Sequence, residues 1–309
     1  MAAEALGSSA DSLRATHSSA LRMRAIALMC AATIFFAALD TSAKSLSGVL
    51  PAVEIVWARY VAAAIVGIVA VRPFAHPAVF RSRRPLLQIV RSLLLLGSTT
   101  ANFLALRQLQ LAETSTINFL TPLFVVLLAG PLLGEWAGGG RLVAVAVGFI
   151  GVVVATGPGT SAFHPVVMIA IAGVLCNAGY ALTTRMLASA DSSKTTLTWT
   201  PLAGVVLLTP ALPFVWVNPP TVAALAIMVA MGFFGALGHW LLILAHERAP
   251  ASVLTPFGYT QLLWMILSGL LVFGDRPSTA VLSGAGIVVG CGLYLIWREQ
   301  AGRERRNAV

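Results

Sequence analysis

Charged residues are scarce in this chain of 309 residues, where Asp, Glu, Lys and Arg together make up only 10% of the sequence. A soluble domain carries about 25% charged residues. Hydrophobic residues make up 58% of the chain, too many for the remaining polar groups to cover in water. The composition therefore predicts an integral membrane protein in contact with the lipid bilayer, and it excludes an ordinary soluble domain.

Cysteine is also rare, and the three cysteines, Cys30, Cys176 and Cys291, each stand alone within an apolar run. No CxxC motif and no Cys/His spacing typical of zinc sites is present, so the sequence predicts neither a metal site nor a disulfide framework. A phosphate-binding loop is absent as well, which argues against ATP as a direct energy source. We expect no cofactor, and we interpret the cysteines as small hydrophobic packing residues.

The net charge is +9, a value that in a soluble protein would suggest nucleic-acid binding. Here the basic residues lie almost entirely between and outside the apolar runs, as they do in membrane proteins. The charge distribution therefore predicts orientation in a membrane, and we expect no nucleic-acid partner.

Ten apolar runs are long enough to cross a bilayer, which takes about 20 residues. They cover residues 23–45, 51–71, 87–107, 112–133, 141–158, 165–187, 195–217, 221–246, 251–273 and 277–297. Residues 1–22 are predicted to be a disordered cytoplasmic tail, and residues 298–309 a basic cytoplasmic tail. The first run is too long for a signal peptide, so we interpret it as a membrane helix.

The lysines and arginines test this count of ten. With the N-terminus in the cytoplasm, fifteen of the twenty lie on the cytoplasmic side, and three lie outside: Lys44, Arg107 and Arg276. The other two, Arg59 and Arg91, fall within or at the edge of helices. A wrong number of spans would scramble this bias, so the charge bias predicts ten helices with both termini in the cytoplasm. We expect the protein to lie in the inner membrane of the cell.

The two halves of the chain resemble each other at an offset near 140 residues. Leu-Gly-Glu at 133–135 matches Phe-Gly-Asp at 273–275, and each precedes a helix rich in Gly and Val. Lys44 near the end of the first run similarly matches Arg185 near the end of the sixth. Since each half has five helices, an odd number, the second half enters the membrane from the opposite side. This all-α architecture of two inverted five-helix repeats is typical of secondary transporters.

Several short motifs occur in an order shared with a known family: residues 35–44, residues 51–60 with Trp-Ala-Arg-Tyr at 57–60, and residues 112–135, the last partly repeated at 251–275. In this order the chain resembles the drug/metabolite transporter superfamily, with EamA-type halves at residues 23–158 and 165–297. It departs from the family in having Asp275 where Glu is usual and in lacking a second-half counterpart of Arg59. The resemblance implies a substrate cavity lined by the first, third, fourth, sixth, eighth and ninth helices.

Ionisable groups within a membrane span are costly, and they therefore mark candidate functional sites. Asp40 lies about 7 Å and Arg59 about 12 Å from the outer surface, at 1.5 Å per helical residue. We expect the two side chains to face each other, either as part of a substrate site or as an ion pair that fixes the packing of the first two helices. Lys44 and Arg185, at matching places in the repeat, are candidates for gating or ion pairing.

Other polar or aromatic groups within the spans complete the predicted substrate site. Asn102 and His239 occupy matching places in the two halves, and His239 is either a proton carrier or a hydrogen-bonded packing residue. The remaining candidates are Asn118, Tyr180, Trp240, Tyr259 and Gln261.

These features predict a secondary transporter that moves a small organic metabolite by alternating access. The resemblance favours uptake of a cofactor-like or amino-acid-like solute, with riboflavin and S-adenosylmethionine as candidates, and leaves export of amino acids or drugs as an alternative. A membrane-embedded transferase is a further alternative, although the sequence has no DxxxD, DxxD or HxxxxD motif for its chemistry. The glycines of the tenth helix suggest close packing against the fifth helix or against a second copy in a homodimer.

Overall fold

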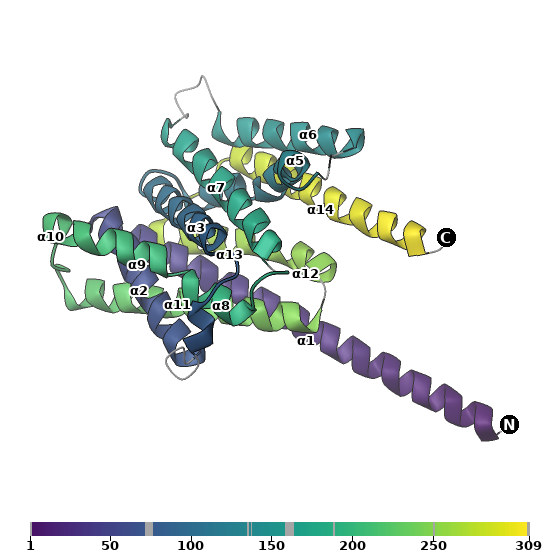
Figure 1. The fold of residues 1–309 in the computed structure, drawn as a ribbon. Helices are drawn as coiled ribbons and strands as arrows, with labels where there is room; N and C mark the ends of the chain where they lie inside the picture. Colours follow the sequence, from purple (N-terminus) through teal and green to yellow (C-terminus); the bar gives the residue numbers. More distant parts are fainter. Residues whose placement is uncertain are drawn as a thin grey trace.

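The computed structural model describes residues 2–71, 77–134, 136, 138–157, 164–187, 189–249 and 251–307, which form helices joined by short turns (Figure 1). In the first half the elements are α1 (Ala2–Leu46), α2 (Ala52–Val71), η1 (Pro77–Phe80), α3 (Pro85–Leu106), α4 (Leu111–Asn118), α5 (Thr121–Leu133) and α6 (Gly139–Thr156). In the second half they are α7 (Val166–Leu187), α8 (Ser193–Trp199), α9 (Leu202–Leu208), η2 (Thr209–Ala211), α10 (Leu212–Val215), α11 (Val222–Arg248), α12 (Ala251–Gly258), α13 (Thr260–Ser268), η3 (Gly269–Phe273) and α14 (Thr279–Asn307).

Within these described ranges, nine helical segments are long and apolar enough to cross a membrane, and Thr279–Leu295 of α14 forms a slightly shorter tenth. Each coincides with one of the ten predicted runs. Large apolar side chains are strongly exposed on the outside of the bundle, such as Phe214 at 87% and Leu271 at 79%. Lipid is the solvent that this surface suits, and the prediction of a multi-pass, all-α membrane protein is confirmed.

The first helix extends beyond its membrane-spanning part, Leu21–Leu46. Its backbone is helical from Ala2, through the residues predicted as a disordered tail, and these first turns project away from the other helices (Figure 1). Alanine recurs along this stretch and is the strongest helix former, which accounts for the helical backbone. The predicted boundary between the halves falls partly on residues 158–163, and Glu135 of the repeat motif is likewise outside the described residues.

Two spans are broken at equivalent places in the repeat. The fourth span breaks between α4 and α5 at Phe119, and the ninth breaks between α12 and α13 at Tyr259, an offset of 140 residues. Thr121 donates its hydroxyl to the carbonyl of Asn118 at 2.7 Å, and Thr260 likewise bonds a carbonyl three residues earlier. Such hydroxyls occupy carbonyls that a broken helix would leave unpaired in lipid. The two breaks lie where the halves meet, because the rings of Phe119 and Tyr259 pack with centres 4.9 Å apart.

The seventh span is broken more often, into α8, α9, η2 and α10. Pro201 lies between α8 and α9, and Pro210 and Pro213 lie in the first turns of η2 and α10. Each proline lacks the backbone N–H that a continuous helix needs.

The packing of the helices follows the repeat. α1 packs most extensively against α11, and α3 packs against α7 in the same way. Exchanging the halves turns the first pair into the second, because α1 corresponds to α7 and α3 to α11. The fifth and tenth spans, α6 and α14, pack against each other. The arrangement thus has the internal symmetry that the offset of 140 residues predicts.

Glycines mark two features of this symmetry. Gly134 and Gly274 both end their helices with positive φ angles, 72° and 70°, where a side chain would be strained. On α14, a Cβ at Gly284 would lie 2.3 Å from the carbonyl oxygen of Gly151 on α6. The close approach of these helices requires glycine, as predicted for the tenth helix and the fifth.

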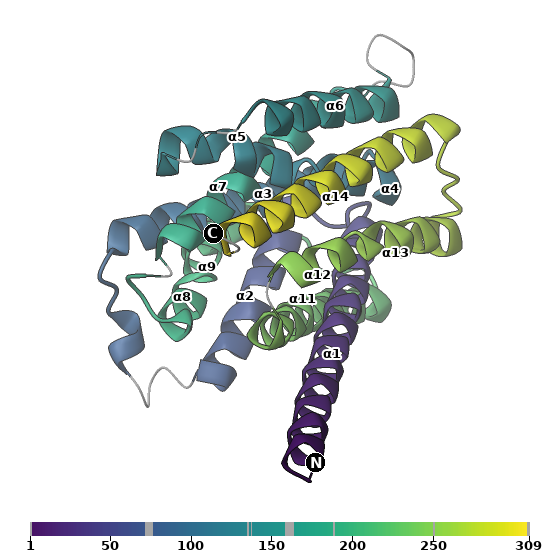
Figure 2. The same cartoon turned by 90° about the vertical axis from the view of Figure 1, so that its right-hand side faces the viewer.

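Two large apolar cores hold the bundle together, and a smaller third one joins α1, the end of α11 and α12. One large core joins α5, α6, α7 and α14, and the other joins α1, α2, α3 and α11. Figures 1 and 2 show α6 and α14 on one side of the molecule and α1 with α11 on the other. Both termini lie at the same end of the bundle, as an even number of spans requires; we refer to it as the terminal end.

Candidate functional site

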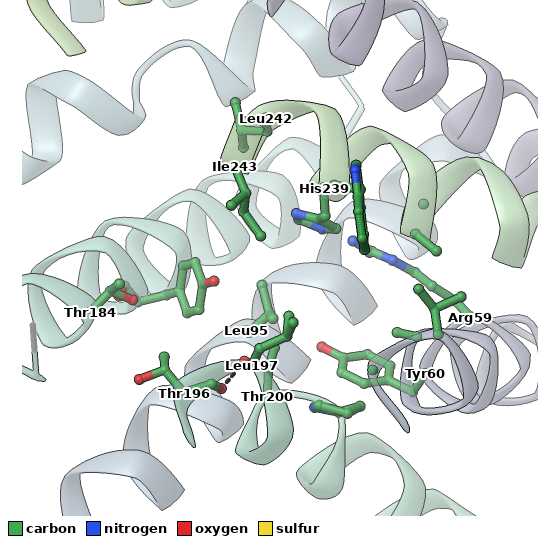
Figure 3. A pocket seen from close by; sticks show the side chains of 18 of the residues that line it. Arg59, Tyr60, Leu95, Thr184, Thr196, Leu197, Thr200, His239, Leu242 and Ile243 are labelled. Atoms are coloured by element: carbon green, nitrogen blue, oxygen red, sulfur yellow. Dashed lines mark hydrogen bonds between the residues drawn. The ribbon is translucent and has the colours of Figure 1, made fainter. Parts of the chain in front are cut away.

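A cavity of about 380 Å³ lies between α2, α3, α7, α8 and α11, and so draws its walls from both repeats. Its polar and aromatic lining residues are Arg59, Tyr60, Arg91, Tyr180, Thr184, Asp191, Thr196, Thr200, His239 and Trp240. Figure 3 shows Arg59, Tyr60 and His239 on one side of the cavity, with Thr184 and Thr196 on the other. A volume of this size suits a small organic molecule.

The cavity extends toward the terminal end of the bundle. On α11 its lining runs from Gly235 to Ile243, in the half of the helix that ends at Arg248. It also includes Asp191, which lies in the turn after α7. The wall residues of α3 and α7 lie on the halves nearest the terminal end, and those of α2 run from Arg59, near the middle of the helix, to Gly67.

Arg91 on α3 is the most buried charge in the cavity wall, with 4% of its surface exposed. Its Nε donates to Thr184 Oγ1 at 2.7 Å, Nη1 to Thr200 Oγ1 at 2.8 Å, and Nη2 to the Tyr180 hydroxyl at 2.8 Å. The guanidinium carbon also lies 4.5 Å from the centre of the Tyr180 ring, a cation–π distance. Arg91 thus ties α3 to α7 and α8.

Arg59 and Asp40 do not form the direct pair that their depths suggested. Arg59 Nη1 donates to Thr99 Oγ1 at 2.9 Å, and its guanidinium lies 5.6 Å from the Phe103 ring centre. Asp40 is buried and accepts from the amide of Asn102 at 3.2 Å. Arg59 still acts on the Asp40 carboxyl through space. Depth along a helix is predictable from sequence, but the direction of a side chain around that helix is not.

Asp40 ends a short chain of amide hydrogen bonds. Asn118 donates its side-chain amide to Asn102 Oδ1 at 2.8 Å, and Asn102 donates in turn to Asp40. The chain joins α4, α3 and α1 just behind the cavity wall. The structure thus brings Asp40, Asn102 and Asn118 together, although none of the three lines the cavity.

The other predicted site residues divide into two groups. Tyr180, His239 and Trp240 line the cavity together with Arg59, and His239 packs edge-on against Phe36 with ring centres 5.0 Å apart. Tyr259 and Gln261 lie elsewhere, at the break of the ninth span. There the Tyr259 ring packs against Phe119 at 4.9 Å.

Lys44 lies at the end opposite the termini. Its ammonium group donates to the carbonyl of Leu109 at 2.6 Å, lies 3.4 Å from Asp275 Oδ2, and lies 5.2 Å from the centre of the Phe273 ring. These contacts join the end of α1 to the turn after α3 and to the end of the ninth span. Arg185, its counterpart in the repeat, is exposed on the last turn of α7 near the terminal end.

Asp191 lies where the cavity meets the terminal end. It accepts a hydrogen bond from the hydroxyl of Ser82, one from the backbone N–H of Arg83 at 2.8 Å, and one from the amide of Gln88 at 2.9 Å. Desolvation raises the pKa of this carboxyl, but the hydrogen bonds outweigh it, and the pKa lies below its ordinary value. The turn before α3 and the turn after α7 are therefore joined through one carboxylate.

Sequence reasoning missed Arg91, Tyr60, the threonines of the cavity wall, and Asp275 as the partner of Lys44. Arg91 had a usable signal, because it lies four residues inside an apolar run and an intramembrane arginine requires an explanation. The threonines carry no such signal, since hydroxyls are common in membrane helices.

Comparison with known proteins places this geometry in a family. Residues 23–157 and 164–298 each match the EamA-like transporter family, so the family's repeat occurs twice. The chain is 26% identical over 226 residues to the S-adenosylmethionine uptake transporter of Rickettsia bellii, covering 73% of this chain and 77% of that protein. It is 30% identical over 193 residues to the riboflavin transporter of Vibrio cholerae, covering 60% of this chain and 63% of that one.

A third relative, the riboflavin transporter of Brucella anthropi, is 26% identical over 224 residues, covering 71% of this chain and 78% of that protein. One solved crystal structure, 21% identical, shares the fold with a TM-score of 0.56 over 89% of this chain and 95% of the other. A membrane-embedded transferase is not supported, since the family consists of transporters. Two matched repeats and a cavity between them lead to one conclusion: the chain belongs to the EamA-like transporter family.

Proposed function

We propose that the chain imports a small, cofactor-like metabolite by secondary transport, with S-adenosylmethionine and riboflavin as the first candidates. The observation that carries the proposal is the cavity of about 380 Å³ between the two repeats, whose lining extends toward the terminal end of the bundle. The relatives named as S-adenosylmethionine uptake and riboflavin transporters support this substrate class. Arg59, Tyr180, His239 and Trp240 line the cavity and are the proposed substrate contacts.

Alternating access needs a closed end that can open while the other end closes. Lys44 with Asp275 and Leu109 is the proposed latch of the end opposite the termini. By the repeat, Arg185 is the proposed latch of the terminal end in the alternate state. In the repeat, Glu135 corresponds to Asp275 and would be the acidic partner of Arg185, but it lies outside the described residues.

Asp40, Asn102 and Asn118 lie behind the cavity wall, and Tyr259 and Gln261 lie at the broken ninth span. We propose that these residues line the path when the opposite end opens, because the repeat relates α1 and α3 to cavity-lining α7 and α11. His239 is the proposed proton carrier if transport is coupled to protons. Replacing His239 with Gln should then flatten the pH profile of uptake, whereas an unchanged profile would remove His239 from coupling.

We propose, from the charge bias of the loops, that the protein lies in the inner membrane with both termini in the cytoplasm. We also propose that two copies can form a homodimer. In this orientation the cavity faces the cytoplasm. A reporter enzyme active only in the periplasm, fused after Val309, should give no signal. The same reporter inserted after Val49, in the turn between α1 and α2, should be active.

Growth rescue tests the function directly. Bacteria that cannot synthesise S-adenosylmethionine or riboflavin should grow on the external metabolite when they express this chain. The Arg59→Ala variant should reach the membrane in equal amount but fail to support growth. Efflux without uptake would favour the exporter alternative, and rescue by Arg59→Ala equal to wild type would remove Arg59 from the site.

A further inference from the structure

Arg91 is a buried cation that has only neutral partners. Its three hydrogen bonds go to two threonine hydroxyls and one tyrosine hydroxyl. A guanidinium has five N–H groups, so two of them have no acceptor within the described part of the chain. The acidic side chain in the same cavity wall, Asp191, bonds Ser82, Arg83 and Gln88 instead.

Arg59 brings a second guanidinium into the same wall. It makes one hydrogen bond, to the neutral hydroxyl of Thr99, which leaves most of its N–H groups unoccupied by the described residues. Asp40 offsets part of its charge through space but makes its own hydrogen bond with Asn102. Figure 3 shows Arg59 beside Tyr60 at the cavity, and Arg91 lines the same space from α3.

A purely structural role does not account for this charge. Tying α3 to α7 and α8 through hydroxyl groups needs hydrogen-bond donors, which a neutral amide can supply. A cation buried in a membrane protein is costly unless an anion faces it. Planar guanidinium groups also bind carboxylates and phosphates through two parallel hydrogen bonds, a geometry that the free N–H groups can provide.

We propose that the substrate carries an oxyanion group, a carboxylate or a phosphate, that binds between Arg91 and Arg59 in this cavity. The inference rests on the proposed function and narrows it. The rest of the molecule would lie against the aromatic and apolar wall that includes Tyr60 and Trp240. S-adenosylmethionine has a carboxylate, whereas riboflavin has no oxyanion unless it is phosphorylated.

Paired probes that differ in this group test the proposal. The first pair is S-adenosylhomocysteine, which has a carboxylate and an ammonium group, and methylthioadenosine, which lacks both. The second pair is flavin mononucleotide and riboflavin, which differ only in the phosphate. Binding to the purified full chain is measured by calorimetry at low and moderate salt. In at least one pair the anionic member should bind about tenfold tighter or more, as expected for a hydrogen-bonded charge pair.

Variants assign this preference to the arginines. Arg91→Gln keeps hydrogen-bond donors but removes the charge, and should reduce the preference for the anionic member of a pair by about tenfold. Arg91→Lys keeps the charge but lacks the planar guanidinium group, and its preference for the anionic member should lie between those of wild type and Arg91→Gln. Lys194→Gln removes an exposed cation at the terminal end and should leave the preference unchanged.

The proposal is overturned if wild-type protein binds both members of each pair equally, or if folded Arg91→Gln and Arg59→Gln both keep the preference. If Arg91→Gln does not fold, the wild-type comparison and Arg59→Gln still decide. Failure of every probe to bind also overturns the oxyanion site. Uptake of a neutral metabolite by vesicles containing the protein would then show that the proposed transport function stands without it.

Discussion

The proposed latch at Lys44 gives the sharpest prediction about the transport cycle. Its ammonium group bonds Leu109 and faces Asp275 across 3.4 Å, and both charged side chains are mostly buried, with 16% and 22% of their surface exposed. In the proposed cycle these contacts belong to the state in which the end opposite the termini is closed. The Lys44→Met substitution removes them and nearly preserves the length of the side chain.

The size of the effect follows from these contacts. Hydrogen bonds to charged groups contribute about 1.5–3 kcal/mol, and partial exposure reduces this to about 1–2 kcal/mol. That loss changes the ratio of the two states about 5- to 30-fold. A protein with about 1% of molecules open at this end would then have about 5–25% open.

Double electron–electron resonance between two spin labels can detect the molecules that are open at this end. Spin labels at Val49 and Ser278, both exposed, lie in the turns on either side of the latch. The native cysteines Cys30, Cys176 and Cys291 are first replaced by serine. In Lys44→Met a second, longer distance should appear or grow.

Lys44→Arg is the matched control, because it keeps the charge and a donor, and it should retain the wild-type distribution. An unchanged distribution in Lys44→Met, in protein with normal thermal stability, would refute the assignment of Lys44 as a latch.

Three further predictions concern stability. Gly284→Ala should lower the melting temperature in detergent and reduce the stability by about 1–3 kcal/mol, because the new Cβ meets the carbonyl of Gly151. Gly286→Ala on the same helix has open space around it and should be near neutral, so equal melting temperatures of the two variants would refute close packing of α6 and α14. Asn102→Ala should lower the free energy of unfolding by about 1–3 kcal/mol, because it leaves Asp40 without its hydrogen-bond donor. Gln108→Ala, in the exposed turn after α3, should change it little, and a larger loss for Gln108→Ala than for Asn102→Ala would contradict the chain of amide hydrogen bonds. The pKa of Asp191 is lower in the folded state than its ordinary value of 3.8, so its hydrogen bonds stabilise the fold above that pH, and this stabilisation is lost as pH falls through the folded pKa. In melting curves, the stability advantage of wild type over Asp191→Asn should shrink below about pH 4. A difference that stays constant with pH would contradict this stabilising role of the Asp191 carboxylate.

The fold was largely predictable because it depends on patterns that the sequence carries directly. Apolar length gives the spans, and the offset of 140 that relates Gly134 to Gly274 gives the repeat. The exact break of the fourth and ninth spans was not predictable. It depends on how Phe119 and Tyr259 pack across the interface between the halves, which local sequence does not encode.

The site was predictable only in part. Arg59, Tyr180, His239 and Trp240 line the cavity, and they could be chosen from the sequence because intramembrane polar and aromatic groups are unusual enough to notice. Tyr259 and Gln261 were chosen on the same basis, yet they lie outside the cavity. Helices that are apolar all around give the depth of a residue but not the direction in which its side chain points, and that direction separates the two groups.

Uptake into vesicles with the cavity blocked tests the central claim most directly. Ala236→Trp places an indole in the cavity wall, whereas Val229→Trp places one on the exposed face of the same helix. With purified protein in vesicles and labelled S-adenosylmethionine or riboflavin, we expect accumulation of one unchanged solute by wild type and by Val229→Trp, and none by Ala236→Trp. Equal accumulation by all three proteins would contradict transport through this cavity.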